Sequence, residues 1–291
     1  MKYKVKHKTI YNYGEIVNIC HSLACLQPRN LPIQQCWDFK LNVSPHTNDL
    51  LQRIDYFGNN LHSFSIQQPH SKLEIVATSI VEVHKNPMDL TLAQSISFGE
   101  AQKLFKEDQD LRVETLEYLI ESPMIQWNKD VFEFAKSCFE SEIPLYKCVE
   151  ELCSKIYKEF TFKPNYTNVN TSVFQVLKDK KGVCQDFTHF AIACFRSMGI
   201  AARYVSGYLE TLPPPGKPKL QGSDASHAWV SVYIPGHGWF DYDPTNNIPP
   251  AERHVTISWG RDYSDVAPLK GIVFSSSLQS LKVEVDVLPV K

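Results

Sequence analysis

The stretch "KGVCQDFTHF" at residues 181–190 places a cysteine between a Lys-Lys-Gly turn and an apolar periodic run. From Phe187 to Met198 the apolar residues are spaced as one face of an α-helix, and Gly199 suits the position just past its C-terminus. Cys194 lies within this face, so it is predicted to be a core residue. Cys184 precedes the face by three residues and therefore falls at the expected N-terminus of the helix.

That position gives Cys184 a different chemistry from a core cysteine. The unpaired backbone N–H groups and the positive end of the helix dipole favour a thiolate over a thiol. The same N–H groups could bind an oxyanion. A cysteine at a helix start can also be an ordinary packing residue, so a general base must be found elsewhere in the chain.

A candidate base lies in "SHAWVSVYIPGHGWFDYDPT" at residues 226–245, which predicts a β-hairpin around "PGHG". Pairing Val232 with Gly238 matches the apolar residues of the two strands and sets His227 directly opposite Asp243. This register needs a loop of odd length, residues 233–237, with Gly238 at a positive φ. An even loop without a bulge would put the two side chains on opposite faces.

Such a pair could activate a thiol. Cross-strand neighbours lie about 5 Å apart at Cβ, which lets the Asp243 carboxylate hold the Nδ1–H of His227. The other ring nitrogen would then deprotonate a thiol that faces it. The approach of Cys184 to this pair does not follow from spacing.

The chain divides by texture into two regions. Residues 1–86 are rich in alternating β-branched and aromatic residues and predict an antiparallel β-domain. Residues 87–291 are predicted to form a catalytic domain with a helical part at 87–158, a core at 159–250 and C-terminal strands at 251–291. The Pro-rich segment 211–224 predicts a surface loop. The fold class expected is α+β.

Composition narrows the function classes. The net charge of −2 argues against a nucleic-acid partner. The N-terminus lacks a signal-peptide core, and no window approaches the roughly 20 apolar residues of a membrane span. The eight cysteines form no tight disulfide framework. We therefore expect a cytoplasmic protein with no membrane partner, while its oligomeric state stays open.

Three motifs in order resemble those of one family. "GVCQDF", "SHAWVSVY" and "GWFDYDPT" resemble the nucleophile, histidine and aspartate motifs of the bacterial transglutaminase-like superfamily, a papain-like group of cysteine enzymes. "FGNNLHSFSI" and "WGRDYSDVAPLKG" resemble further segments of members with an N-terminal β-domain. The resemblance implies a nucleophile at a helix N-terminus packed on an antiparallel sheet. It assigns Cys184 as nucleophile, His227 as base and then acid, and Asp243 as the orienting carboxylate.

Less specific candidates surround this triad. Tyr166 and Gln185 are candidates for the second oxyanion donor or for residues lining the substrate groove. Trp229 is expected to shield the site or line the groove, with core packing as the alternative. No cofactor and no metal is expected. A zinc site built on Cys184, His189 and Cys194 is an alternative, but the sequence has no matching Cys-x-x-Cys pair.

The function that the resemblance implies is thiol-dependent acyl transfer from a peptide or protein substrate. Water would complete the reaction in a hydrolase of peptide or carboxamide bonds, and an amine would complete it in a transglutaminase. The absence of a calcium-loop pattern and the constant supply of water favour hydrolysis. A non-catalytic scaffold that binds peptides is the third possibility.

Overall fold

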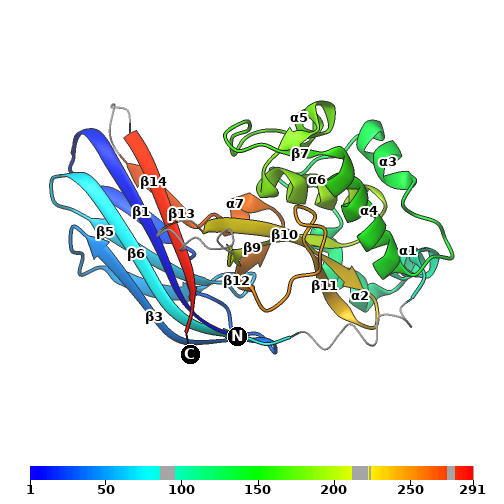
Figure 1. Cartoon of the computed structure of the whole chain (residues 1–291), viewed down its shortest axis with the longest axis horizontal. Helices are drawn as coiled ribbons and strands as arrows, with labels where there is room; N and C mark the ends of the chain where they lie inside the picture. Colours follow the sequence, from blue (N-terminus) through cyan, green and yellow to red (C-terminus); the bar gives the residue numbers. More distant parts are fainter. Residues whose placement is uncertain (86–95, 212–221, 223, 274–278, 291) are drawn as a thin grey trace, which may run out of the picture.

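The computed structural model describes residues 1–85, 96–211, 222, 224–273 and 279–290. A β-sandwich built mainly from the N-terminal strands lies beside a part that combines helices with a central sheet (Figure 1). Together they confirm the expected α+β class. Most of the predicted Pro-rich loop at 211–224 lies outside the described residues. None of the described helices is both long enough and apolar enough to cross a membrane.

The sandwich consists of two antiparallel sheets that pack face to face. One sheet has the order β14 (Gln279–Pro289), β1 (Lys2–Val17), β6 (His70–Val83) and β3 (Gln34–Ser44). The other has the order β13 (Leu269–Val273), β2 (Cys20–Ala24), β5 (Asn60–Ile66) and β4 (Leu50–Ile54). Strand β6 alternates strictly along most of its length, so Leu73, Ile75 and Ala77 enter the core between the sheets.

The C-terminal strands differ from the sequence-based division, which placed residues 251–291 in the catalytic domain. Strand β14 pairs with β1, and β13 pairs with β2, so both complete the N-terminal sandwich. Of the C-terminal strands within the described residues, only β12 (His254–Gly260) joins the central sheet. The two chain ends therefore lie close together at one end of the sandwich (Figure 1).

The second part contains a central antiparallel sheet with the order β11 (Gly238–Tyr242), β10 (Ala225–Ile234), β9 (Ala202–Leu209) and β12. Helix α6 (Cys184–Ser197) packs on β10 and β9 and carries the predicted apolar face. A short parallel pair, β7 (Thr161–Phe162) and β8 (Lys181–Gly182), precedes it. The other helical elements are α1 (Phe98–Glu107), α2 (Gln109–Thr115), the 3₁₀ turn η3 (Leu116–Tyr118), α3 (Lys129–Lys136), α4 (Leu145–Glu159), α5 (Val173–Asp179) and α7 (Tyr263–Val266).

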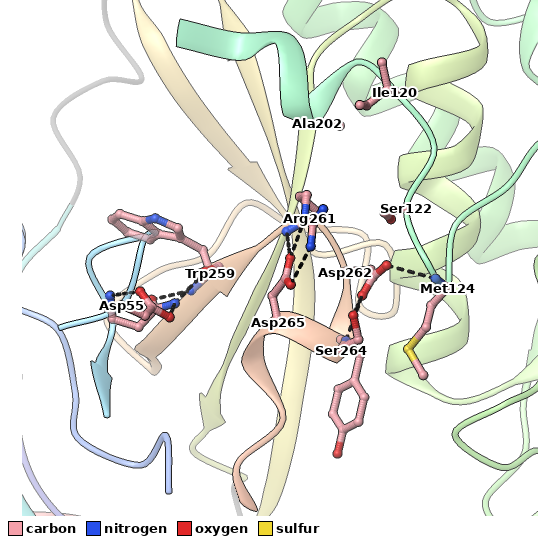
Figure 2. A network of polar contacts seen from close by, with 12 residues as sticks. Asp55, Ile120, Ser122, Met124, Ala202, Trp259, Arg261, Asp262, Ser264 and Asp265 are labelled. Atoms are coloured by element: carbon pink, nitrogen blue, oxygen red, sulfur yellow. Dashed lines mark hydrogen bonds and ion pairs between the residues drawn. The ribbon is translucent and has the colours of Figure 1, made fainter. Parts of the chain in front are cut away.

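The sandwich is fixed to the central sheet in two ways. Tyr208 and Val255 of the sheet share an apolar cluster with Val5 and Val285 of the sandwich. A polar junction also joins them: the buried side chain of Asn59 in the sandwich hydrogen-bonds to both the N–H and the C=O of Trp259 in the central sheet. Figure 2 shows Asp55 beside Trp259, followed by the Arg261–Asp265 ion pair and Asp262.

Candidate active site

The turn before helix α6 sets the position of Cys184. Asp186 is buried, and its Oδ2 accepts hydrogen bonds from the Val183 N–H (2.7 Å) and the Thr167 hydroxyl (2.6 Å). A Cβ at Gly182 would lie 2.7 Å from that Oδ2, so only glycine leaves room for the carboxylate. The sequence "KGVCQD" thus forms a capped start with Cys184 as the first residue of the helix.

The two cysteines of α6 have different environments. Cys194 is fully buried in the helical core, and burial raises the pKa of its thiol. Cys184 is half-buried, lines a cavity, and has its Sγ 4.0 Å from the carbonyl oxygen of Ser226. The structure therefore places the two thiols as the helical spacing predicts.

The cavity brings His227 and Asp243 to the same place. His227 lies on β10, and Asp243 follows directly after β11. The His227 Nε2 and the Asp243 Oδ2 are 2.6 Å apart, and Cys184 and His227 both line the cavity. The three predicted side chains are thus brought together: Cys184 and His227 line the same cavity, and Asp243 contacts His227.

The hairpin register differs from the predicted one by two residues. Ile234 pairs with Gly238 and Val230 with Tyr242, so the loop is residues 235–237 instead of 233–237. Gly236 and Gly238 both adopt positive φ values, which permits this tighter loop. A shift of two preserves the face, so His227 and Asp243 still meet, although diagonally and not directly opposite.

The roles of the two imidazole nitrogens are also reversed. Asp243 contacts Nε2 of His227, whereas the sequence argument placed it on Nδ1. Since Nε2 is occupied, Nδ1 is the nitrogen left to face Cys184.

The surroundings of His227 and Asp243 favour the charged form of each side chain. Burial alone would lower the pKa of His227, but the hydrogen bonds and charges of Asp243 and Cys184 outweigh it and raise that pKa to about 10. Burial alone would raise the pKa of Asp243, but the hydrogen bonds from His227 and His254 outweigh it and lower it. An imidazolium beside a sulfur favours the thiolate.

Asp243 has further donors that the sequence argument missed. The Ala251 N–H bonds Nδ1 of His254, so the proton of this buried histidine sits on Nε2, 3.3 Å from the Asp243 Oδ2. The Asn246 Nδ2 donates to the same oxygen at 2.6 Å. The spacing "DPTN" could have indicated Asn246 as a local turn partner. His254 comes from β12, and no local pattern places that strand beside the site.

A cavity of about 290 Å³ opens in front of Cys184. One side, here called the catalytic wall, consists of Val183, Cys184, Gln185, Ser226 and His227. The facing side, here called the domain wall, comes from the sandwich strands β1 and β14 and consists of His7, Thr9, Tyr11, Leu281 and Val283. No spacing pattern in the sequence indicates this domain wall.

Of the less specific candidates, only Gln185 lines the cavity. The Tyr166 side chain is 41% exposed and donates its hydroxyl proton to Asp179 at 3.0 Å, away from Cys184. Trp229 is fully buried beneath the triad, donates its Nε1–H to Asp241 at 2.9 Å and packs edge-on against His254. The expectation that Trp229 lines the groove is therefore wrong, and its core alternative holds.

The proposed zinc alternative does not assemble. The His189 Nε2 accepts the Tyr263 N–H, and Cys194 is in the helical core. In the described part of the chain, the ligand-type atoms that gather are those of His227, Asp243 and His254. Two nitrogen or oxygen ligands about 2.0 Å from a tetrahedral zinc lie about 3.3 Å apart, so a 2.6 Å contact between His227 and Asp243 fits a hydrogen bond better.

Comparison with known proteins agrees with this architecture. Residues 3–82 match the bacterial transglutaminase-like N-terminal region, and residues 133–244 match the transglutaminase-like superfamily core. An uncharacterized protein of Mycobacterium tuberculosis is 39% identical over 295 residues, covering 99% of this chain and 93% of its own length. One from Mycobacterium leprae is 31% identical, covering 98% of this chain and 97% of its own length. The chain belongs to the transglutaminase-like superfamily.

A solved structure shares the whole fold. The crystal structure of a candidate cysteine protease from Cytophaga hutchinsonii superposes with a TM-score of 0.77 at 23% sequence identity. The match covers 100% of this chain and 92% of that one. At this level of identity the likeness establishes the fold, including the sandwich joined to the central sheet.

Proposed function

We propose that the protein is a thiol-dependent hydrolase that cleaves peptide or carboxamide bonds through an acyl-thioester on Cys184. His227 acts as base and then acid, and Asp243 orients it. The observation that carries this proposal is the hydrogen-bonded pair of Asp243 and His227 on the wall of the cavity that Cys184 also lines. Membership in the transglutaminase-like superfamily supports the same class of chemistry.

The reaction proceeds in two balanced steps. The Cys184 thiolate attacks the substrate carbonyl carbon, a C–S bond forms, and the C–N bond then breaks as the amine leaves with a proton from His227. Water next attacks the thioester while His227 takes its proton, the C–S bond breaks, and the acid is released. Open N–H groups in the first turn of α6 would stabilise the oxyanion in both steps.

Thiol labelling tests the nucleophile before any substrate is known. Iodoacetamide at pH 6, followed by peptide mapping, is expected to modify Cys184 far faster than the other cysteines, since Cys184 lines the cavity beside His227, whose pKa is raised. His227→Ala should slow this labelling. Slow and uniform labelling of all cysteines would support the scaffold alternative and contradict the proposal.

Product analysis then separates hydrolysis from amine transfer. A glutamine-containing peptide is incubated with and without a lysine-like amine, and the products are identified by mass. The proposal expects the free acid in both reactions. Exclusive incorporation of the amine would instead assign the protein as a transglutaminase.

A further inference from the structure

The domain wall is built from residues far apart in sequence that share one face of one sheet. In the pairing of β1 with β14, Thr9 lies opposite Val283, and Tyr11 lies opposite Leu281. Antiparallel partners point to the same face, so all four side chains face the cavity of Cys184 together. The N-terminal domain is therefore part of the site itself.

The lining of the cavity carries no fixed charge. Within the described residues, no Lys, Arg, Asp or Glu side chain reaches it. His7 is neutral, because burial lowers its pKa to about 4, and its ring is held between the Tyr208 hydroxyl (2.9 Å) and the Thr9 hydroxyl (3.0 Å). Cys184 and His227 are the lining residues that the proposed reaction uses.

Apolar side chains of the cavity lining are also partly exposed. Leu281 and Val283 are 58% and 46% exposed although they border the cavity. Leu269 and Tyr263 extend this surface toward the central sheet. Covering such side chains with an apolar group is favourable, whereas placing a charge against them without a counter-ion is costly.

We propose that the domain wall selects substrates whose attacked carbonyl belongs to a residue with an uncharged, apolar or aromatic side chain. This inference rests on the proposed function, since it assigns the acyl side of the same reaction. The cavity of about 290 Å³ is at the lower end of ligand sites, so it accommodates one such side chain with its flanking backbone.

Affinity labels test the selection without requiring turnover. N-acetylated chloromethyl ketones of leucine, phenylalanine, glutamate and lysine differ only in the side chain next to the carbonyl. The Cys184 thiolate attacks the methylene carbon, a C–S bond forms and chloride leaves. The leucine and phenylalanine reagents are expected to label Cys184 roughly 100-fold faster than the charged ones. Equal rates for all four reagents would overturn the inference.

Charge variants of the exposed wall residue sharpen the test. In Leu281→Glu, the lysine chloromethyl ketone should gain roughly tenfold in labelling rate relative to the leucine reagent, because the new carboxylate attracts its charge. In Leu281→Lys, the glutamate reagent should gain roughly tenfold relative to the leucine reagent for the same reason. Every rate is divided by the iodoacetamide rate of the same variant, which removes any change in thiol reactivity. Leu288→Glu, on the same strand and 43% exposed but outside the cavity, is the matched control. Unchanged preferences in both Leu281 variants would overturn the inference.

The two proposals fail in different ways. Selective labelling of Cys184 by the apolar reagents without cleavage of any peptide amide would contradict the hydrolase and leave the selectivity intact. Cleavage of peptides that carry leucine and lysine at equal efficiency would contradict the selectivity and leave the hydrolase intact. Thermal unfolding followed by circular dichroism verifies that every variant is folded.

Discussion

The two walls of the cavity are encoded in opposite ways. The catalytic wall and Asp243 come from residues 183–243, and each member lies at a helix start or on one hairpin. The domain wall joins residues 7–11 to residues 281–283, almost the full length of the chain apart. Chemistry is thus held by short-range structure, whereas recognition depends on the closure of the N-terminal sandwich by the last strand.

Removing the sulfur of Cys184 from the catalytic wall is expected to have the largest effect on turnover. Cys184→Ala should abolish turnover while the free energy of unfolding stays nearly unchanged, because the thiol is half-buried at the edge of the cavity. Cys194→Ala is the matched control on the same helix: it should retain turnover and lower the free energy of unfolding by about 1 kcal/mol, since it leaves a small void. Peptide hydrolysis and urea unfolding measure both. Turnover by Cys184→Ala would show that Cys184 is not the nucleophile.

Asp243→Asn should follow in size. An amide keeps the shape of the side chain but removes the charge, so turnover should fall roughly 10²- to 10⁴-fold. The carboxylate helps to hold the pKa of His227 near 10, and burial alone lowers it, so the pKa should fall in the variant. The imidazolium is lost as pH rises through that pKa, so the alkaline limb of the activity profile should move to lower pH.

The control for this prediction is Asp241→Asn, two residues earlier on β11, whose side chain accepts a hydrogen bond from Trp229. It should leave the pH profile in place. An unchanged profile in Asp243→Asn would show that the carboxylate does not set the charge of His227. Iodoacetamide labelling of Cys184 at pH 6 provides a second readout and should slow in Asp243→Asn alone.

The sequence could predict the part of the site that comes from residues close together in the chain. The helical spacing located Cys184 and separated it from Cys194, and strand parity put His227 and Asp243 on one face. The predicted register of the hairpin differs from the observed one by two residues. The reason is that Gly236 and Gly238, both with positive φ, close a shorter loop than the apolar pairing suggested. That error changed which ring nitrogen meets the carboxylate but not which residues meet.

Residues whose position depends on distant pairing were out of reach. Trp229 shares the face of His227, as parity predicts, but Gly207 on the next strand lets the indole sink inward: a Cβ there would lie 2.5 Å from its ring. His254 reaches Asp243 only because β12 pairs with β9. The domain wall needs β14 to pair with β1, and one sequence carries no local signal for that pairing.

A variant of His254 tests whether its hydrogen bond to Asp243 contributes to catalysis. His254→Ala removes one hydrogen bond to the Asp243 carboxylate, about 1.5 kcal/mol, so kcat should fall roughly tenfold. KM should stay unchanged, because His254 does not line the cavity. His254→Gln keeps an N–H donor and should recover part of the loss. Equal defects in both variants would show that His254 only packs against Trp229, and a rise in KM would show that His254 acts on substrate binding instead.

The smallest effect on catalysis is expected at the junction that joins the two walls. Asn59 is fully buried and bonds the Trp259 N–H and C=O, and its Oδ1 accepts from Arg29 at 2.6 Å. Asn59→Ala removes these buried hydrogen bonds and should lower the free energy of unfolding by about 1–3 kcal/mol, measured by urea unfolding. The exposed Asn48→Ala is the control.

The same variant also separates the walls functionally. Since the junction holds the sandwich against the central sheet and not the triad itself, iodoacetamide labelling of Cys184 should persist in folded Asn59→Ala. The preference for the leucine over the lysine chloromethyl ketone should weaken, because the domain wall loses a fixed position. If labelling collapsed while the preference survived, the junction would belong to the catalytic wall, and the division between local chemistry and long-range recognition would be wrong.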